Sequence, residues 1–582
     1  MNLHQLDPRQ MILESAGHVL VTGGPGSGKT TIALRKALRK IDEGILCGQS
    51  ILFLSFSRAA VARILQASEK EMPASAIKQL SIQTFHSFCW DFIKCHGYLL
   101  GAPKKLEILL PHDEKALSGG VGRYDKEWTA WEAERERLFL HEGRVAFDLF
   151  APKAANLIER SSLVRKMLAN QFPLIIVDEA QDTGPDAWRC IDLLAANVPI
   201  ICLADLEQQI FDFLPGIGPE RIACIERELK PLCVDLGSEN KRSPGTEIVA
   251  FANDILACKT PKNSYIGIMN HAYNPKDCNY KQQLAYSLRK VRDYVKEKTG
   301  HLPRNYAILA TTGACVNKIS GALNGGDKPI PHKVFFDEAE VLLASRLVAF
   351  LLEPKQSGNL LEDIAKCLEF LADIKRASGQ HAKQIINFIH WASQLRCGKQ
   401  PKANIVTELA ELILLVVQVQ FAGIPEKDWL TVKRMLRTSP SRDIAVIAEH
   451  LDYLVAFNRG KRISSNLSAL WSEWGTYRGA RDAIDEALTQ DWILSGLDDL
   501  SGIHVLTIHR AKGKEFDAVI IFVGNVRYSA DGFQSDLVWR NDPAPHFRSR
   551  KILRVAITRA RHCVLIVRPI YPKCPIISPY CL

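Results

Sequence analysis

The sequence lacks the cysteine pattern of secreted or metal-clustered proteins. It contains no C-x-x-C pair, and its fifteen cysteines are odd in number and scattered along the chain. These features argue against a disulfide framework, a zinc ribbon and an iron–sulfur cluster, and they favour reduced thiols. Membrane signals are also missing, because the first residues are too polar for a signal peptide and the longest apolar run, residues 412–417, is too short to span a bilayer. We therefore predict a cytoplasmic protein without membrane contact.

A strong excess of one charge is also absent. The net charge of +10 is spread over 582 residues, so it favours a polyanionic partner such as nucleic acid only slightly. An apolar content of 47% and a charged content of 24% are typical of ordinary globular proteins. The length predicts about three to five domains. No internal repeat or low-complexity segment interrupts the chain.

What the sequence does contain is a glycine-rich loop between an apolar run, residues 18–21, and a helix-forming run, residues 31–36. The loop fits the pattern G-x-x-x-x-G-K-[ST], and its flanks argue against a chance glycine-rich turn. Glycines let backbone N–H groups turn toward phosphate oxygens, while Lys29 would reach the β- and γ-phosphates and Thr30 would bind Mg²⁺. We predict a nucleotide-binding site formed by Gly23, Gly24, Pro25, Gly26, Ser27, Gly28, Lys29, Thr30 and Thr31.

Two carboxylates follow a second apolar strand, residues 174–177. In a phosphate-loop hydrolase, Asp178 would hold the Mg²⁺ and Glu179 would polarise the attacking water. A strand followed by Asp-Glu is common by itself. In a chain that already has the phosphate loop, it is a strong indication of a phosphate-loop hydrolase.

Other polar residues near predicted strand ends are ambiguous when each is taken alone. Gln10 is either a solvated helix residue or a partner for the adenine edge. Residues 55–60 and 80–88 place hydroxyl groups and an aromatic ring where open α/β sheets bind ligands, but such positions are more often core and helix cap. Gln208 could sense a γ-phosphate, and Arg242 could contact one, although each is more often an ordinary surface residue.

Taken together and in order, these stretches resemble the motif series of the UvrD/Rep family of superfamily 1 helicases. Gln10 matches the glutamine motif, residues 23–30 motif I, residues 55–60 motif Ia and residues 178–182 motif II. The remaining matches are residues 83–86 (TFH), 147–149 (weakly, DF), 205–213 (III), 240–243 (IV), 330–334 with the helix through Glu340 (IVa), 507–516 (V) and 555–560 (VI). The matches span almost the whole chain.

The resemblance implies an α/β fold with two RecA-like parallel-sheet domains, each carrying a mainly helical inserted subdomain. The first domain would comprise residues 1–88 and 171–238, with its insertion at 89–170. The second would comprise residues 239–350 and 501–582, with its insertion at 351–500.

The resemblance also implies residue roles. ATP would bind between the two domains, with Gln10 and Glu515 among the nucleotide contacts, and Arg242 and Arg559 would act as arginine fingers. The catalytic set implied is Lys29, Glu179, Gln208, Arg242 and Arg559, and the metal set is Thr30 and Asp178. The single-stranded DNA contacts implied are Phe56, Ser57, Thr84, His86, Phe213, Thr507 and His509.

The chain departs from the family pattern at several positions. Lys241 replaces an aromatic residue that stacks on adenine, so adenine recognition would depend more on Gln10. Motif III is altered at Ala204, Gln209 and Leu214. Before motif VI, Arg548 and Ser549 stand in place of the usual acidic pair, and Arg554 stands in place of the usual tyrosine. The extra positive charge implies a firmer contact with the DNA backbone. The departures are therefore expected to affect DNA contacts more than hydrolysis.

Three functions remain open from the sequence. The first is an ATP-dependent translocase or helicase acting on single-stranded or tailed duplex DNA, with 3′–5′ polarity implied by resemblance alone. The second is a DNA-stimulated ATPase subunit that unwinds little and serves a separate nuclease, in DNA repair or in antiviral defence of the Gabija type. Compact insertions, the altered motif III and the few residues after motif VI favour it modestly. The third is an RNA motor.

Overall fold

The computed structural model describes residues 7–580, except 120, 123–124, 206–219, 238–242, 276–278, 326–327, 335–338, 356–358, 378–381, 453–460, 495–500, 525, 530–531 and 540–541. The chain divides into two compact units. The first comprises Met1–His96, Ala151–Phe335 and Gly496–Leu582, and the second comprises Gly97–Phe150 and Phe336–Ser495. The predicted sites fall almost entirely in the first unit.

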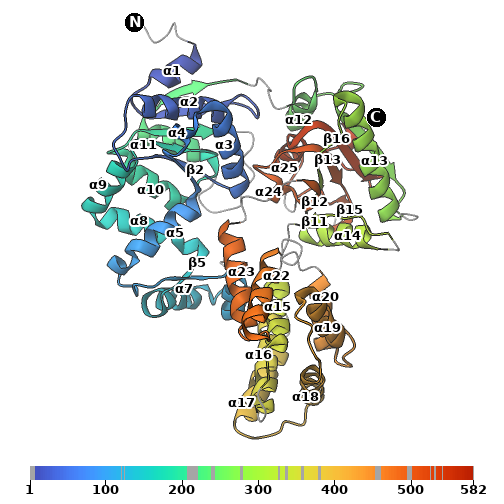
Figure 1. Cartoon of the computed structure of the whole chain (residues 1–582). Helices are drawn as coiled ribbons and strands as arrows, with labels where there is room; N and C mark the ends of the chain where they lie inside the picture. Colours follow the sequence, from blue (N-terminus) through green and yellow to red (C-terminus); the bar gives the residue numbers. More distant parts are fainter. Residues whose placement is uncertain are drawn as a thin grey trace. The chain divides into compact units, whose positions relative to one another are not determined.

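The first unit contains two six-stranded sheets, and the N-terminal one has the strand order β3-β2-β6-β7-β1-β8 with every neighbouring pair parallel (Figure 1). Its central strands are continuous apolar runs, as expected where helices cover both faces of a parallel sheet. The strands are β1 (Val19–Thr22), β2 (Ile51–Ser55), β3 (Leu80–Thr84), β6 (Ile175–Val177), β7 (Ile200–Ala204) and β8 (Leu232–Asp235). The helices are α1 (Pro8–Glu14), α2 (Lys29–Asp42), α3 (Arg58–Glu71), α4 (Ala74–Ile77), α5 (Phe85–His96), α8 (Phe150–Arg160), α9 (Ser162–Gln171), α10 (Pro185–Ala195) and α11 (Glu220–Leu229).

The second sheet of this unit has the order β11-β12-β10-β13-β16-β9 and is also parallel throughout. Its strands are β9 (Ile268–Tyr273), β10 (Asn305–Ala310), β11 (Lys333–Val334), β12 (Gly502–Thr507), β13 (Phe516–Phe522) and β16 (Ala560–Pro569). Its helices are α12 (Ile248–Leu256), α13 (Tyr280–Thr299), α14 (Gly313–Asn324), α24 (Ile508–Ala511) and α25 (Phe547–Ile557), beside a hairpin of β14 (Val526–Ser529) and β15 (Gly532–Ser535). Two RecA-like parallel sheets are present, so the predicted fold class is confirmed.

The second unit is mainly helical and combines residues from both predicted insertions. From the first come α6 (Pro111–Ser118), α7 (Trp128–Arg137) and a parallel strand pair that the sequence did not predict, β4 (Glu107–Leu109) and β5 (Arg144–Ala146). From the second come α15 (Ala339–Leu352), α16 (Leu360–Ala377), α17 (Ala382–Arg396), α18 (Asn404–Val417), α19 (Pro425–Arg437), α20 (Arg442–Asp452), α22 (Lys461–Trp474) and α23 (Ala480–Leu494). The six-segment domain boundaries stay a prediction.

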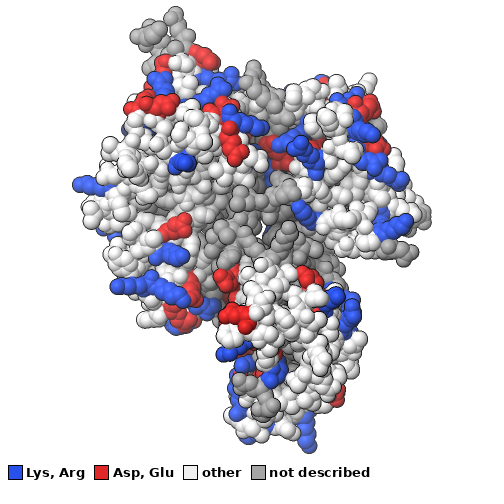
Figure 2. All heavy atoms as spheres, in the orientation of Figure 1, with Lys and Arg blue, Asp and Glu red and all other residues white. Residues whose placement is uncertain are grey.

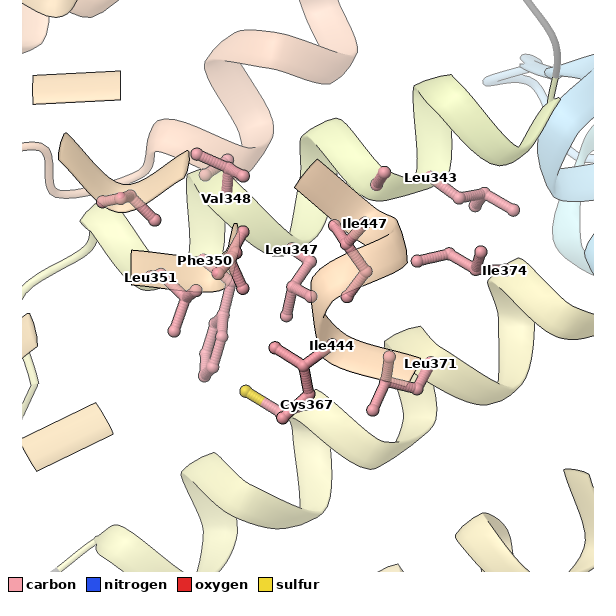
Figure 3. Close-up of a cluster of buried hydrophobic side chains, with 14 of the residues drawn as sticks. Leu343, Leu347, Val348, Phe350, Leu351, Cys367, Leu371, Ile374, Ile444 and Ile447 are labelled. Carbon is pink, nitrogen blue, oxygen red and sulfur yellow. The ribbon is translucent and has the colours of Figure 1, made fainter. Parts of the chain in front are cut away.

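Apolar side chains of α15, α16 and α20 interlock in the core of this unit (Figure 3). Leu347 from α15, Leu371 from α16 and Ile444 from α20 are each almost completely buried there. Ala116 from α6 belongs to the same apolar cluster, which joins the first insertion to the second. In the part of the chain that the structure describes, no helix is long and apolar enough to cross a membrane.

An ion-pair network also joins the two insertions. Both outer nitrogens of Arg346 on α15 contact the Asp113 carboxylate on α6, and Arg346 Nε lies 2.6 Å from Asp485 Oδ1 on α23. Burial alone would raise the pKa of Asp113, but Arg346 lowers it below its usual value. One guanidinium thus holds three helices from separate parts of the sequence.

Removing this guanidinium is expected to destabilise the second unit. Arg346→Ala leaves two carboxylates without their partner in a site where the arginine is only 17% exposed, so we expect a loss of about 3 kcal/mol in the free energy of unfolding. Denaturant unfolding monitored by tryptophan fluorescence measures it. Arg396→Ala is the matched control, because Arg396 also bridges two carboxylates, Glu362 and Glu369, but is 40% exposed; its loss should stay below about 1 kcal/mol. Equal losses in the two variants would contradict the interpretation.

Candidate active site

The glycine-rich loop connects β1 to α2, and Lys29 is the first residue of that helix. Gly28 precedes the helix with a φ of 91°, a left-handed conformation that glycine adopts at no steric cost. A Cβ on Gly23 would lie 2.7 Å from Ser27 Oγ, so the loop is too tight for a side chain there. Lys29 Nζ donates to the carbonyl oxygens of Gly23 at 2.6 Å and Gly24 at 2.9 Å. The amine is therefore folded over the loop, where a phosphate would be recognised.

The two motif II carboxylates follow β6 directly. The backbone N–H of Asp178 donates to Leu54 on β2, and the Ser55 hydroxyl donates to Asp178 Oδ2 at 3.3 Å. Glu179 has a φ of 52°, a conformation that non-glycine residues rarely adopt and that often marks functional sites. Gln181 Nε2 donates to Glu179 Oε2 at 2.6 Å, and Gln181 Oε1 accepts the N–H of Asp205 after β7. Gln181 thus fixes the Glu179 carboxylate to the neighbouring strand.

The two carboxylates have opposite electrostatic environments. Burial and the neighbouring Glu179 raise the pKa of Asp178 to about 6, against the opposing effect of Arg63 and Lys29. Burial would likewise raise the pKa of Glu179, but four positive charges lower it instead to about 2. These charges belong to Lys512, Arg63, Lys29 and Arg559. Glu179 is therefore ionised at neutral pH, as a group that polarises water must be.

Residues from the second sheet reach the motif II carboxylates. Lys512, which follows α24, forms an ion pair with Asp182, and both side chains are almost fully buried. Arg63 on α3 lies 3.7 Å from Asp178 Oδ2 and 3.7 Å from Glu515 Oε1. Charged groups of both sheets therefore meet in one site.

Arg559, one of the two expected arginine fingers, lies between α25 and β16 and is 1% exposed. Its Nε donates to the Val555 carbonyl oxygen at 3.0 Å, and its charge contributes to the lowered pKa of Glu179. Glu515, expected to contact nucleotide, lies 3.2 Å from Arg561 Nη2. The amide of Gln10, expected to contact adenine, donates to Glu14 at 2.5 Å. Gln208, Arg242, Phe213 and Lys241 lie outside the described residues.

Sequence reasoning missed Arg63, Gln181 and Lys512 as site residues. Gln181 and Lys512 stand inside motifs II and V, so their position in those motifs was the available signal. Arg63 had no such signal, because it is one basic residue of a surface-type helix. Arg63 becomes a site residue only because folding brings Asp178 and Glu515 within ion-pair distance of its guanidinium.

The expected DNA contacts lie where β2, β3 and β12 end. Two of their hydroxyl groups cap helices: Ser57 Oγ accepts the N–H of Ala60 at 3.2 Å, and Thr84 Oγ1 accepts that of Ser87 at 3.1 Å. His86 is exposed, Phe56 is half-buried and Thr507 precedes α24. The His509 ring packs edge-on against Trp539, with ring centroids 5.3 Å apart. Contact of these residues with DNA stays a prediction.

The firmer backbone contact expected from Arg554 is wrong. Its side chain is completely buried, and its Nε donates to Asn253 Oδ1 on α12 at 2.9 Å. Arg554 therefore joins two helices beneath the second sheet and has no surface to offer a phosphate. Arg548 lies with its guanidinium 5.1 Å from the centroid of the Trp539 ring.

The donor set fits Mg²⁺ bound together with ATP. No group of three or more His, Cys, Asp or Glu side chains that could hold a metal ion occurs among the described residues. Magnesium in phosphate-transfer sites usually takes only one or two protein ligands and completes its shell with phosphate oxygens and water. Thr30 on the first turn of α2 and the Asp178 carboxylate after β6 provide that small set.

The fold and the site define the class of protein, and comparison with known proteins then identifies the family that the chain resembles. Two parallel RecA-like sheets, with a phosphate loop after β1 and paired carboxylates after β6, define a P-loop nucleotide-binding protein. The model of the UvrD/REP helicase N-terminal domain matches residues 5–142 and 122–217. The chain is UvrD/Rep-like.

Relatives that align with nearly the whole chain support the similarity to UvrD/Rep helicases. The ATP-dependent DNA helicase PcrA of Staphylococcus aureus is 20% identical over 97% of this chain and 83% of its own length. The putative ATP-dependent DNA helicase YjcD of Bacillus subtilis is 23% identical over 98% of this chain and 78% of its own length. PcrA of Staphylococcus epidermidis is 21% identical over 96% of this chain and 82% of its own length. The alignments extend across both sheets and both insertions.

Proposed function

We propose that the protein is an ATP-dependent DNA helicase or translocase that moves 3′–5′ on single-stranded DNA. The observation that carries the proposal is the meeting of Lys512 and Arg559, from the second sheet, with the motif II carboxylates of the first. A nucleotide held by both sheets can change their separation when its γ-phosphate is lost. The PcrA and YjcD relatives, whose names specify ATP-dependent DNA helicases, support DNA as the track.

Each residue then has a distinct part in hydrolysis. Lys29 binds the β- and γ-phosphates, and Glu179, held by Gln181, orients and polarises the attacking water. Arg559 and Arg242 stabilise the charge that develops on the γ-phosphoryl group. Thr30 and Asp178 would hold Mg²⁺, which would neutralise phosphate charge. Loss of the γ-phosphate removes the ligand that holds the arginines, and the two sheets separate.

The DNA contacts follow the strand ends of both sheets. Phe56, Ser57, Thr84 and His86 belong to the first sheet, and Thr507 and His509 belong to the second. Because each sheet carries its own contacts, a change in separation moves one set along the strand relative to the other. Stacking and backbone contacts tolerate any sequence, which suits a translocase.

A second candidate function is a DNA-stimulated ATPase that unwinds little and serves a nuclease partner. The altered motif III favours it, since Gln209 stands in place of a serine and Leu214 in place of the arginine beside the expected base-stacking Phe213. Unwinding of a tailed duplex by the isolated protein separates the two candidates. Strong unwinding contradicts the second candidate, and hydrolysis stimulated by DNA without unwinding favours it.

Replacing Lys29 tests the proposal directly. We expect single-stranded DNA to stimulate steady-state ATP hydrolysis by the wild-type protein, and Lys29→Ala to reduce that rate by about 100-fold or more, because the phosphates lose their principal positive partner. Lys40→Ala is the matched control, since Lys40 lies on the same helix but its side chain is 38% exposed. An RNA strand of equal length tests the RNA alternative. Absence of stimulation by either nucleic acid contradicts the proposed motor.

Polarity has its own measurement. Duplexes that carry a 3′ tail or a 5′ tail of the same length are compared as unwinding substrates. The proposed 3′–5′ polarity requires the 3′-tailed duplex to be opened faster. Faster opening of the 5′-tailed duplex contradicts that polarity and leaves the ATPase proposal intact.

A further inference from the structure

We propose that α13 carries a second binding surface for single-stranded DNA, formed by Tyr286, Lys290, Tyr294 and Lys298 and called here the tyrosine–lysine stripe. This inference rests on the proposed function and deepens it, because it assigns a further contact for the same nucleic acid. The stripe lies on the outer helix of the second sheet and includes none of the motif residues. Its ligand is a polyanion with flat bases.

Helix α13 is strongly basic on the side that does not pack against the second sheet. It covers the second sheet through Leu284, Ser287, Val291 and Val295, all buried. Along its length, six basic residues stand against two acidic ones; these are Lys281, Arg289, Lys290, Arg292, Lys296 and Lys298 against Asp293 and Glu297. Figure 2 shows several Lys and Arg side chains gathered where α13 lies in Figure 1, with few acidic ones. A large part of the chain's excess positive charge is therefore on this helix.

Aromatic rings alternate with the ammonium groups along one side. Members of the stripe are four residues apart, so they lie on neighbouring turns with about 6 Å between successive members. Lys290 Nζ lies 5.9 Å from the centroid of the Tyr286 ring, and Lys298 Nζ lies 5.9 Å from that of Tyr294. Each ring is therefore paired with a cation that could contact a phosphate next to a stacked base.

The edge strand β9 supports the Tyr286 end of the stripe. The His271 ring on β9 packs against Tyr286 with centroids 4.7 Å apart, and His271 Nε2 lies 2.6 Å from Gln283 Oε1. Lys290 Nζ donates to the Asn270 carbonyl oxygen at 3.4 Å. The Tyr286 side chain packs against His271 on β9 yet remains 43% exposed. A ring that is held in place and half open to solvent is suited to stacking, because little side-chain entropy remains to be lost.

The ordinary interpretation is a solvated basic helix. Local ion pairs support it at two positions, where Arg292 lies 2.9 Å from Asp293 and Lys298 lies 3.6 Å from Glu297. Solvation does not require tyrosines at alternate members of the stripe, whereas a strand with exposed bases uses both charge and rings. An acidic protein segment would form ion pairs with the lysines, but it would not account for the tyrosine rings. Single-stranded DNA is therefore the ligand that fits both features.

The double variant Tyr286→Ala/Lys290→Ala tests the stripe in the full-length protein. We expect its affinity for a long oligothymidylate, measured by fluorescence anisotropy, to fall about tenfold. The slope of log affinity against log salt should become shallower by about 0.7, because the variant neutralises one phosphate fewer. ATP hydrolysis stimulated by saturating DNA should keep its maximal rate, which also shows that the variant is folded.

The matched control is Lys94→Ala/Tyr98→Ala. It removes the same two residue types at the same spacing from a site without the alternating pattern, and both side chains are exposed. A second variant, Lys290→Glu/Lys298→Glu, keeps both rings and reverses the charge. It should weaken binding at low salt by more than the first variant.

Two results overturn the inference. One is wild-type affinity and salt slope in both stripe variants, and the other is an equal loss in the control. The proposed motor function fails by a different result: ATP hydrolysis by the wild-type protein would not respond to single-stranded DNA. The two failures are therefore distinguishable.

Discussion

Glu179→Gln is expected to reduce DNA-stimulated ATP hydrolysis by about a thousandfold while leaving nucleotide affinity nearly unchanged. Glutamine keeps the size of the side chain and can still bond to Gln181, but it cannot accept a proton from water. The lowered pKa of Glu179 means that the native carboxylate is ionised at neutral pH, so the substitution removes a charged base. Steady-state hydrolysis and binding of a fluorescent ATP analogue measure the two quantities separately.

Gln181→Leu provides the comparison for this variant. It leaves the carboxylate in place but removes the hydrogen bond of 2.6 Å that orients it. We expect a smaller loss, about tenfold in kcat, because misplacement of a catalytic group costs less than its removal. Hydrolysis by Glu179→Gln above a tenth of the wild-type rate would show that another group activates the water.

Lys512→Ala is expected to change both stability and pH dependence. Lys512 and Asp182 form an ion pair that is almost completely excluded from solvent. Burial raises the pKa of Asp182 to about 7 even beside Lys512, so without the lysine this carboxyl group takes up a proton at neutral pH. We expect the lost hydrogen bond and ion pair to cost about 1–3 kcal/mol in the free energy of unfolding. Among the positive charges that lower the pKa of Glu179, Lys512 has the largest effect. Its loss should therefore raise that pKa, and the acidic limb of the pH–rate profile should move to higher pH.

The sign follows from the protonation state that hydrolysis needs. Glu179 must be ionised, so activity is lost as the pH falls through its pKa. A higher pKa in the variant moves this loss toward neutrality. Lys512→Arg keeps the charge and should keep the position of the acidic limb. Arg510→Ala, at an exposed neighbouring position, should change neither property. An unmoved acidic limb in a folded Lys512→Ala protein would contradict the electrostatic role.

Local chemistry made the core of the nucleotide site predictable. The phosphate loop is eight consecutive residues, Gly23–Thr30, and the structure places it between β1 and α2 as expected. Asp178 and Glu179 are likewise read directly from the end of an apolar strand. The two parallel-sheet domains were implied by the resemblance to the UvrD/Rep family, and apolar runs that alternate with helical patterns are typical of such sheets. In each case the determining residues are neighbours in the chain.

Contacts between distant residues were not predictable in this way. Lys512 and Asp182 are separated by 330 positions, and either could pair with many other charges. Arg554 shows the same limit, since nothing local indicates whether a basic residue on α25 faces Asn253 in the interior or a phosphate outside. The sequence alone therefore determined the fold class of this protein and the position of its phosphate loop and paired carboxylates in the chain. Only the tertiary structure decided which distant charges surround those groups, because burial and pairing of a charged side chain depend on how separate elements pack.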